Sequence, residues 1–227
     1  MDSRQEQLLL SIIEEYVQSK EPVGSKLLSE KYELHVSPAT IRNDMAALED
    51  EGYIAQPHIS AGRVPTERAY RFWIEHTTLN DLEKKEQQIY AREWRGRAGE
   101  DEIKAIARAL SDRADNTVVV AFSTHDFYYT GLSALFSQPE FSVQASTVSM
   151  ARMIDHLDRI LEGLVAKIHE RTVLLGKDNP FSSDCGFVGT PLKRKHGTGC
   201  IGILGPMRMD YPRHMSRMRF LDELINT

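Results

Sequence analysis

The stretch SPATIRNDMAALEDEG, at positions 37–52, decides which fold the first third of the chain adopts. Ser37 is a typical N-cap residue, and Pro38 suits the first helical position because an N–H there would lack a helical partner anyway. Ile41, Met45 and Leu48 recur at helical spacing, and the stretch ends on a glycine. It therefore predicts a short amphipathic helix with polar side chains exposed on its N-terminal half.

Two helices are predicted before this stretch. Ser3 and Glu6 form a capping-box pattern at the start of a helix over residues 3–19. Pro22 and a following glycine end that helix, and Ser25 is the expected cap of a second, shorter one.

A hairpin and a fourth helix are predicted after it. Residues 53–56 are expected to be extended, residues 57–65 to form a loop or hairpin tip, and Thr66 to cap the next helix. This order of elements predicts a winged helix-turn-helix domain over residues 1–78.

The rest of the chain is predicted to be of mixed character, so the fold class expected for the whole is α+β. Residues 79–115 read as a charged helical linker, and residues 116–227 as a domain with a small antiparallel sheet and packed helices. Strands are expected at 117–122, 173–175, 186–188 and 200–204, and amphipathic helices at 149–171 and 213–225.

Composition argues against several classes of function. The chain has a net charge of −5, no apolar run of the roughly 20 residues that a bilayer span needs, and no apolar signal core behind its first residues. We expect a cytoplasmic protein without membrane contact. Cys185 and Cys200 show neither CxxC nor His-pair spacing, which predicts two partly buried thiols rather than a disulfide or zinc site.

No motif predicts catalysis or a cofactor. HExxH, GxSxG and Walker A patterns are absent, so we expect no enzyme, no metal and no cofactor. Gly197, Gly199 and Gly202 do spell G-x-G-x-x-G, but a strand rather than a helix is expected to follow, which favours a tight hairpin.

The predicted third helix carries the side-chain types that read DNA. Hydroxyls such as Ser37 and Thr40 at a helix start suit phosphate oxygens. Arg42 and Asn43 are able to make bidentate contacts with guanine and adenine edges in a major groove. Asp44 is unfavourable there, unless it pairs with an arginine such as Arg42 or Arg71.

The loop after this helix is predicted to hold the DNA backbone or minor groove. No acid occurs from the glycine at 52 to Thr66, a segment that includes His58, Ser60 and Arg63. We expect His58, Ser60, Arg63 and Thr66 to contact DNA. Arg71 on the next helix is expected to add positive charge.

An alternative remains open because residues 1–78 hold eight Lys and Arg against thirteen Asp and Glu. The acidic balance would suit a sensor or protein-interaction module whose winged helix does not bind DNA specifically. A second question is also open for the arginines at 208, 213, 217 and 219, which predict either a partner surface or an ion-pair network fixing the last helix.

Several strings resemble the heat-inducible transcription repressor HrcA family. They are EPVGS at 21–25, VSPATIRNDMAALEDEGYI at 36–54, QPHISAGRVPTERAYR at 56–71, GLSALFSQPEF at 131–141 and GCIGILGPMRMDY at 199–211. The resemblance implies a homodimeric repressor of chaperone operons that binds an inverted-repeat operator called CIRCE. It also implies support of that activity by the GroEL–GroES chaperonin, and a GAF-like domain after the winged helix.

The sequence departs from that family between Phe122 and Tyr128. Family members have a longer segment there, with further GAF-like strands and an inserted dimerisation domain. In this chain the same segment consists only of residues 123–127. The resemblance therefore implies a reduced GAF-like domain. The usual dimer contact is not expected, and the helix at 149–171 or the C-terminal helix is expected to replace it.

Overall fold

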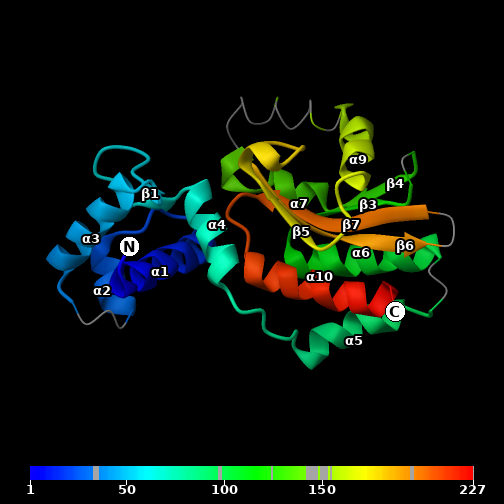
Figure 1. Ribbon diagram of the computed structural model, residues 1–227, viewed down its shortest axis with the longest axis horizontal. Coiled ribbons are helices and arrows are strands. Elements are labelled where there is room, and N and C mark those ends of the chain that lie inside the picture. Colours follow the sequence, from blue (N-terminus) through cyan, green and yellow to red (C-terminus); the bar gives the residue numbers. More distant parts are fainter. Residues whose placement is uncertain are drawn as a thin grey trace. The chain divides into compact units, whose positions relative to one another are not determined.

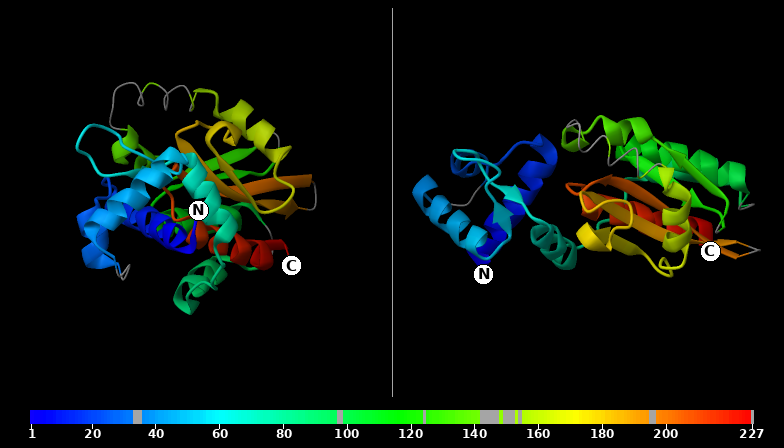
Figure 2. Two further views of the ribbon diagram at one scale, coloured as in Figure 1. Left: turned by 60° about the vertical axis from the view of Figure 1, so that its left-hand side comes forward. Right: turned by 90° about the horizontal axis from the view of Figure 1, so that it is seen from above.

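The computed structural model describes residues 1–32, 36–96, 99–123, 125–141, 148, 153, 155–194 and 197–226. The chain consists of two compact units, unit 1 (Met1–Thr77) and unit 2 (Thr78–Thr227), and each is described by itself. Figure 1 labels their elements, and Figure 2 shows the same ribbon from two further sides.

Among its described residues, unit 1 consists of helices around one small pair of strands. The helices are α1 (Ser3–Ser19), α2 (Ser25–Lys31), α3 (Pro38–Asp50) and α4 (Glu67–His76), and the strands are β1 (Ile54–Ala55) and β2 (Val64–Pro65). The two strands are antiparallel, and an isolated bridge joins Val23 to Arg63. The core gathers apolar side chains from every helix, including Ile12, Leu28, Leu48 and Trp73.

The caps of α1 and α2 differ by one residue from those predicted. Asp2, rather than Ser3, is the N-cap of α1: its carboxylate accepts from the Gln5 N–H at 2.9 Å, and the Gln5 side chain accepts from the Asp2 N–H. Gly24, rather than Ser25, precedes α2. Asp, Ser and Gly all favour the N-cap, so residue type alone does not choose between neighbours.

Unit 2 is built on a five-stranded antiparallel sheet in the order β4-β3-β7-β6-β5, which confirms a mixed fold with an antiparallel sheet and packed helices. The strands are β3 (Thr117–Ala121), β4 (Phe127–Thr130), β5 (Thr172–Leu175), β6 (Cys185–Arg194) and β7 (Gly197–Pro206). The helices are α5 (Lys84–Glu93), α6 (Glu100–Ala114), α7 (Leu132–Phe136), α9 (Leu157–Val165) and α10 (Tyr211–Asn226), with 3-10 turns at Pro139–Phe141 and Gly176–Asp178.

Helices cover both faces of this sheet. Figure 1 shows α7 and α9 on one side and α6 and α10 on the other, and each of these helices contacts the strands. All five residues of β3 are buried, as expected for a strand covered on both faces. Cys185 and Cys200 are free thiols in the apolar cluster beneath α9, so the prediction of two buried cysteines is confirmed.

Two predicted segments differ from the structure. The predicted linker, residues 79–115, forms α5 and α6 within unit 2, because Ile103, Ile106 and Leu110 are buried where α6 packs on β3. The predicted helix at 149–171 is described only in part: residues 149–152 and 154 lie outside the described residues, and α9 ends at Val165.

Candidate nucleic-acid interface

The start of α3 is fixed by the residues that the sequence pattern singled out. The Ser37 hydroxyl accepts from the Thr40 N–H at 3.2 Å, and Pro38 occupies the first turn. The hydroxyls of Ser37 and Thr40 lie 3.0 Å apart. Because the first N–H groups of a helix carry a partial positive charge, this end of α3 favours an anion.

One side of α3 points to solvent, and it is nearly free of acids. Ala39, Arg42, Asn43 and Ala46 are exposed and recur at helical spacing. Of the acids in α3, only Asp50, at its last turn, is exposed. The side chains predicted to read DNA therefore lie on a surface that is open for contact within unit 1.

The sequence analysis offered Arg42 or Arg71 as a partner for Asp44, but the partner in the structure is Arg4. Asp44 is buried and receives two hydrogen bonds from Arg4 of α1, from Nε to Oδ2 and from Nη2 to Oδ1, each 2.9 Å long. This bidentate pair ties α3 to α1 and neutralises the carboxylate. The acid that argued against DNA binding is thereby turned away from the exposed side.

Arg42 is the one cation in the sequence of α3, and it is available for contact. Its Nε donates to the Ser25 hydroxyl at 3.3 Å, and it has no ion pair with a carboxylate in the described ranges. A guanidinium held only by a neutral hydroxyl is able to turn toward a base edge or a phosphate without breaking an ion pair.

The loop between β1 and β2 forms an ordered tip. Gln56 Nε2 donates to the Ala61 carbonyl at 3.1 Å, and the Ala61 N–H donates to the His58 carbonyl at 3.0 Å. Ser60 has φ of +67°, a left-handed conformation that serine rarely adopts. His58 and Ser60 are exposed, and Ile59 is 92% exposed, so the tip points away from the core of unit 1.

Arg63, a predicted DNA contact, already has a partner. Its Nε and Nη2 lie 2.9 Å and 2.8 Å from Glu49 Oε2, and its side chain is 22% exposed. The sequence analysis predicted the contact of Arg63 with DNA but missed its pair with Glu49.

Thr66 and Arg71 also have internal partners. The Thr66 hydroxyl donates to the carbonyls of Gly52 and Tyr53, at 2.8 Å and 3.0 Å, and does not cap α4 with its side chain. Arg71 pairs with Glu67 one turn earlier, at 2.7–2.8 Å. Ser37, Thr40, Arg42 and Asn43 thus lie at the N-terminal half of α3, whereas Arg63 and Thr66 are bonded to residues at and just after its C-terminal turn. The predicted residues are therefore unequally available.

Arg68 is an exposed cation that the site prediction left out. Its guanidinium lies 4.4 Å from the centre of the Tyr53 ring, and Nη1 donates to the Glu51 carbonyl. Its partners are an aromatic face and a carbonyl, and among the described residues no carboxylate forms an ion pair with it. The signal that could have found it is its position in the first turn of α4, directly after the loop.

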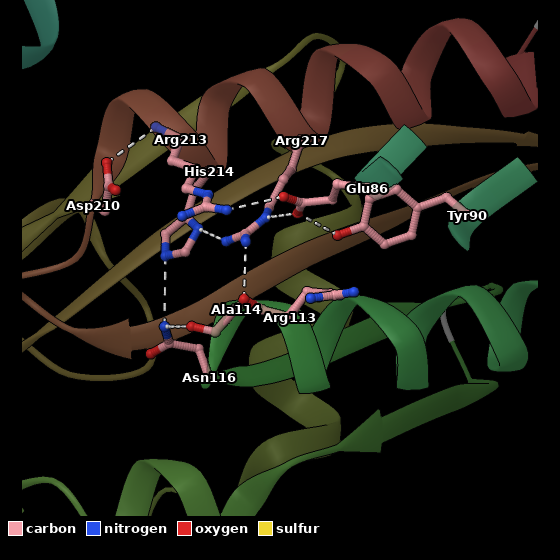
Figure 3. Close-up of polar contacts among 9 residues, drawn as sticks. All are labelled: Glu86, Tyr90, Arg113, Ala114, Asn116, Asp210, Arg213, His214 and Arg217. Carbon is pink, nitrogen blue, oxygen red and sulfur yellow. Dashed lines mark hydrogen bonds and ion pairs between the residues drawn. The ribbon is translucent and has the colours of Figure 1, made fainter. Parts of the chain in front are cut away.

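A second polar cluster lies in unit 2 and joins α5 to α10 (Figure 3). Glu86 accepts from Arg217 at 2.7 Å, from Arg213 at 3.1 Å and from the Tyr90 hydroxyl at 2.9 Å. Burial by itself raises the pKa of Glu86, but hydrogen bonds and charge from Arg217, with Tyr90 and Arg213, outweigh it and leave that pKa below its usual value. For these two arginines, the ion-pair network is therefore the interpretation that fits.

His214 completes this cluster as a neutral ring. Its Nδ1 lies 3.0 Å from Arg217 Nη1, and a guanidinium only donates hydrogen bonds, so Nδ1 must be the acceptor. Burial, followed by the charges of Arg217 and Arg213, lowers the pKa of His214 to about 3. In the part of the chain that the structure describes, no three His, Cys, Asp or Glu residues gather as a metal site.

Comparison with known families decides how the chain is classified. A family model described as "HrcA protein C terminal domain" matches residues 72–215, more than half of the chain. The chain belongs to the HrcA family.

Curated relatives of this HrcA chain extend the similarity. The heat-inducible transcription repressor HrcA of Acidothermus cellulolyticus is 44% identical over 128 residues, which cover 56% of this chain and 38% of that protein. The protein of the same description from Streptomyces avermitilis is 60% identical over 75 residues, 33% of this chain and 22% of the relative. The matched part of the chain thus spans less than half the length of these relatives.

One solved structure shares the fold. A hypothetical protein, known from a crystal structure at 2.2 Å resolution, has a TM-score of 0.77 and 18% identity, and the match covers 100% of this chain and 97% of that one.

The two downstream HrcA-like strings meet in the structure. Arg208 forms an ion pair with Glu140 and donates to the Gln138 side chain at 2.7 Å. The Tyr211 hydroxyl donates to the Met207 carbonyl at 2.6 Å. These contacts fix the turn after α7 beside the end of β7, which gives the shared residues a structural reason.

The point where longer HrcA members are expected to differ is a tight hairpin here. The Phe122 N–H donates to the Asp126 carbonyl at 2.7 Å, and β3 pairs directly with β4.

Among the described residues, no helix combines the length and apolar character that crossing a membrane requires.

Proposed function

We propose that this HrcA chain is a transcription repressor, not an enzyme, and that unit 1 binds operator DNA as a winged helix-turn-helix. The observation that carries the proposal is the exposed side of α3, where Arg42 and Asn43 stand between the small side chains of Ala39 and Ala46. Small neighbours let a helix approach the floor of a major groove, and Arg and Asn match guanine and adenine edges. The description of the curated relatives as heat-inducible transcription repressors supports this assignment.

The remaining predicted residues take graded roles in the proposal. Ser37 and Thr40 contact phosphate at the helix start, and His58 and Ser60 reach the backbone or minor groove from the loop tip. Thr66 and Arg71 have internal partners, so we propose that they shape the base of the loop instead of touching DNA.

Membership in the HrcA family supports a proposal for the operator, the assembly and the regulator. We propose an inverted-repeat operator of the CIRCE type upstream of chaperone genes, bound by a homodimer, since a twofold-symmetric site matches a twofold-symmetric protein. Unit 2 would act as a GAF-like dimerisation and regulatory domain, with the GroEL–GroES chaperonin as the proposed regulator. Footprinting on the regions upstream of chaperone genes tests the proposed operator. A solution mass measurement of the free chain tests the proposed homodimer.

Replacing Arg42 by alanine is expected to weaken operator binding by about 1–3 kcal/mol, roughly fivefold to more than a hundredfold, because a base contact is lost. Fluorescence anisotropy with a labelled inverted-repeat duplex measures this. Arg42→Lys is the matched control, since it keeps the charge but loses the fork that reads guanine. Both variants should bind a random duplex of equal length nearly as wild type does. Wild-type affinity of the alanine variant for the operator would contradict the assignment of Arg42.

One observation favours the alternative of a protein-interaction module. Among the described residues, at least five of the eight cations of unit 1 lie in ion pairs with carboxylates, and the sequence of the unit contains thirteen acids. Salt dependence separates the two functions, because phosphate neutralisation makes DNA binding fall steeply as salt rises. Binding that is absent or insensitive to salt would favour the module.

A further inference from the structure

The ion pair between Glu49 and Arg63 connects the proposed reading helix to the base of the loop. Glu49 lies in the last turn of α3, and Arg63 directly precedes β2. Both Arg63 Nε and Nη2 contact the same carboxylate oxygen, at 2.9 Å and 2.8 Å. The Arg63 side chain is 22% exposed and the Glu49 side chain 33% exposed, so solvent screens this pair only in part.

The backbone of Arg63 is held by a pair of hydrogen bonds to Val23. The Arg63 N–H donates to the Val23 carbonyl at 2.8 Å, and the Val23 N–H donates to the Arg63 carbonyl at 2.9 Å. At Gly62, an added Cβ would lie 2.5 Å from the Val23 carbonyl oxygen, so the two chains meet closely there. The position of the main chain is thus fixed, and the freedom left to Arg63 is the direction of its guanidinium.

We infer that Glu49 sets the affinity of unit 1 for DNA by competing with phosphate for the Arg63 guanidinium. While the pair is closed, the loop base carries no net charge, and a phosphate brought to Arg63 also meets the Glu49 carboxylate. Arg63 then contributes to binding only when it exchanges one anion for the other. Arg42, which has no such carboxylate partner among the residues that the structure describes, contributes without this exchange. The inference rests on the proposed function, because it presumes that unit 1 meets DNA.

An opposite role for Glu49 is physically reasonable and makes the test decisive. A carboxylate is also able to orient an arginine so that its free N–H groups face a phosphate. In that case removal of the carboxylate weakens binding, whereas in our inference removal strengthens it.

The experiment compares the wild-type chain, Glu49→Gln, Arg63→Ala and the double variant on one labelled inverted-repeat duplex over a range of salt. The glutamine side chain keeps the size of Glu49 and an acceptor oxygen but removes its charge. We expect Glu49→Gln to bind roughly three- to tenfold more tightly at low salt, with a salt slope steeper by about one for each chain bound. Arg63→Ala should abolish this gain in the double variant.

Asp50→Asn is the matched control, because Asp50 is an exposed acid on the same helix end and has no contact with Arg63 among the described side chains. Any general effect of removing one negative charge should appear there and should not depend on Arg63. The inference is overturned if Glu49→Gln binds equally or more weakly, or if its gain persists without Arg63. Failure of the proposed function looks different: the wild type itself then shows no salt-sensitive binding, which overturns both.

Discussion

Unit 2 of the Glu86→Ala variant is expected to be less stable than that of the wild type by about 3–5 kcal/mol. The side chains of Glu86 and Arg217 are only 6% and 2% exposed, so the variant leaves a buried guanidinium without its carboxylate. Arg217 Nη2 would still donate to the Arg113 carbonyl at 2.8 Å, but a carbonyl does not balance the charge. The loss should therefore exceed that of an ordinary surface substitution several-fold.

Unfolding in urea, followed by tryptophan fluorescence, measures this loss for unit 2 alone. The chain has two tryptophans, Trp73 in unit 1 and Trp94 in unit 2, so a Trp73→Phe background makes Trp94 the reporter. Asp81→Ala is the matched control: it breaks the Arg219–Asp81 pair, in which Asp81 is 91% exposed, and should change stability by less than about 1 kcal/mol. Equal effects of the two variants would contradict the structural role of Glu86.

A double replacement separates the ion pair from the packing around it. Glu86→Leu together with Arg217→Met removes both charges and should recover much of the stability that Glu86→Ala loses, because buried ion pairs are often replaceable by apolar side chains. If the double variant is as unstable as the single one, the loss comes from the other partners of these residues.

Unit 2 is also expected to lose stability in mild acid because of His214. The native ring stays neutral down to a pKa of about 3, whereas in the unfolded chain it takes up a proton near its usual value of 6.5. Between these values the unfolded state binds more protons, so stability falls as pH decreases, by up to about 1.4 kcal/mol per pH unit. From about pH 7 to about pH 4.5 this single group accounts for roughly 2–3 kcal/mol.

The groups that face His214 make it possible to isolate this effect. They are Arg217, Arg213, Glu86 and Asn116. His214→Gln keeps an acceptor for Arg217 but does not titrate, so its urea midpoint should fall less steeply with pH than that of the wild type. Glu86 adds its own loss only as the pH falls to and below the usual range of a glutamate, because its native pKa is lowered. Parallel pH profiles of wild type and His214→Gln would contradict the neutral, buried ring.

Local signals were sufficient for the elements that form the candidate interface. Ser37 and Pro38 act within one turn of helix, so their types predicted the start of α3 correctly. The contacts that decide which cations are available join distant positions: Arg4 to Asp44, and Glu49 to Arg63. The charge of a side chain predicts that it will pair with an opposite charge, but it does not predict which distant residue provides that charge. The sequence pattern therefore could not predict these pairs.

Strand lengths in unit 2 show a second limit. β6 and β7 are each ten residues long, yet only short strands were predicted within them, because glycine disfavours strands. Gly189 and Gly202 are paired across the two strands, and the Phe187 ring lies against them. An added Cβ would lie 2.5 Å and 2.2 Å from that ring, so these glycines make room for a buried aromatic side chain. Only the packed sheet reveals this requirement.

The most direct test of the central claim maps where α3 lies on DNA. Cys185 and Cys200 are buried, and burial raises both thiol pKa values to about 12, so an added cysteine would be the reactive one. Asp50→Cys places it on the exposed side of α3 at the end away from Arg42, where an attached iron chelate cleaves nearby DNA. We predict cuts within each half of the inverted repeat, and replacing Arg42 by alanine as well should shift their appearance to higher protein concentration, in line with the weaker binding. Binding without cleavage in the half-sites, or cleavage that is the same on random DNA, would contradict the account.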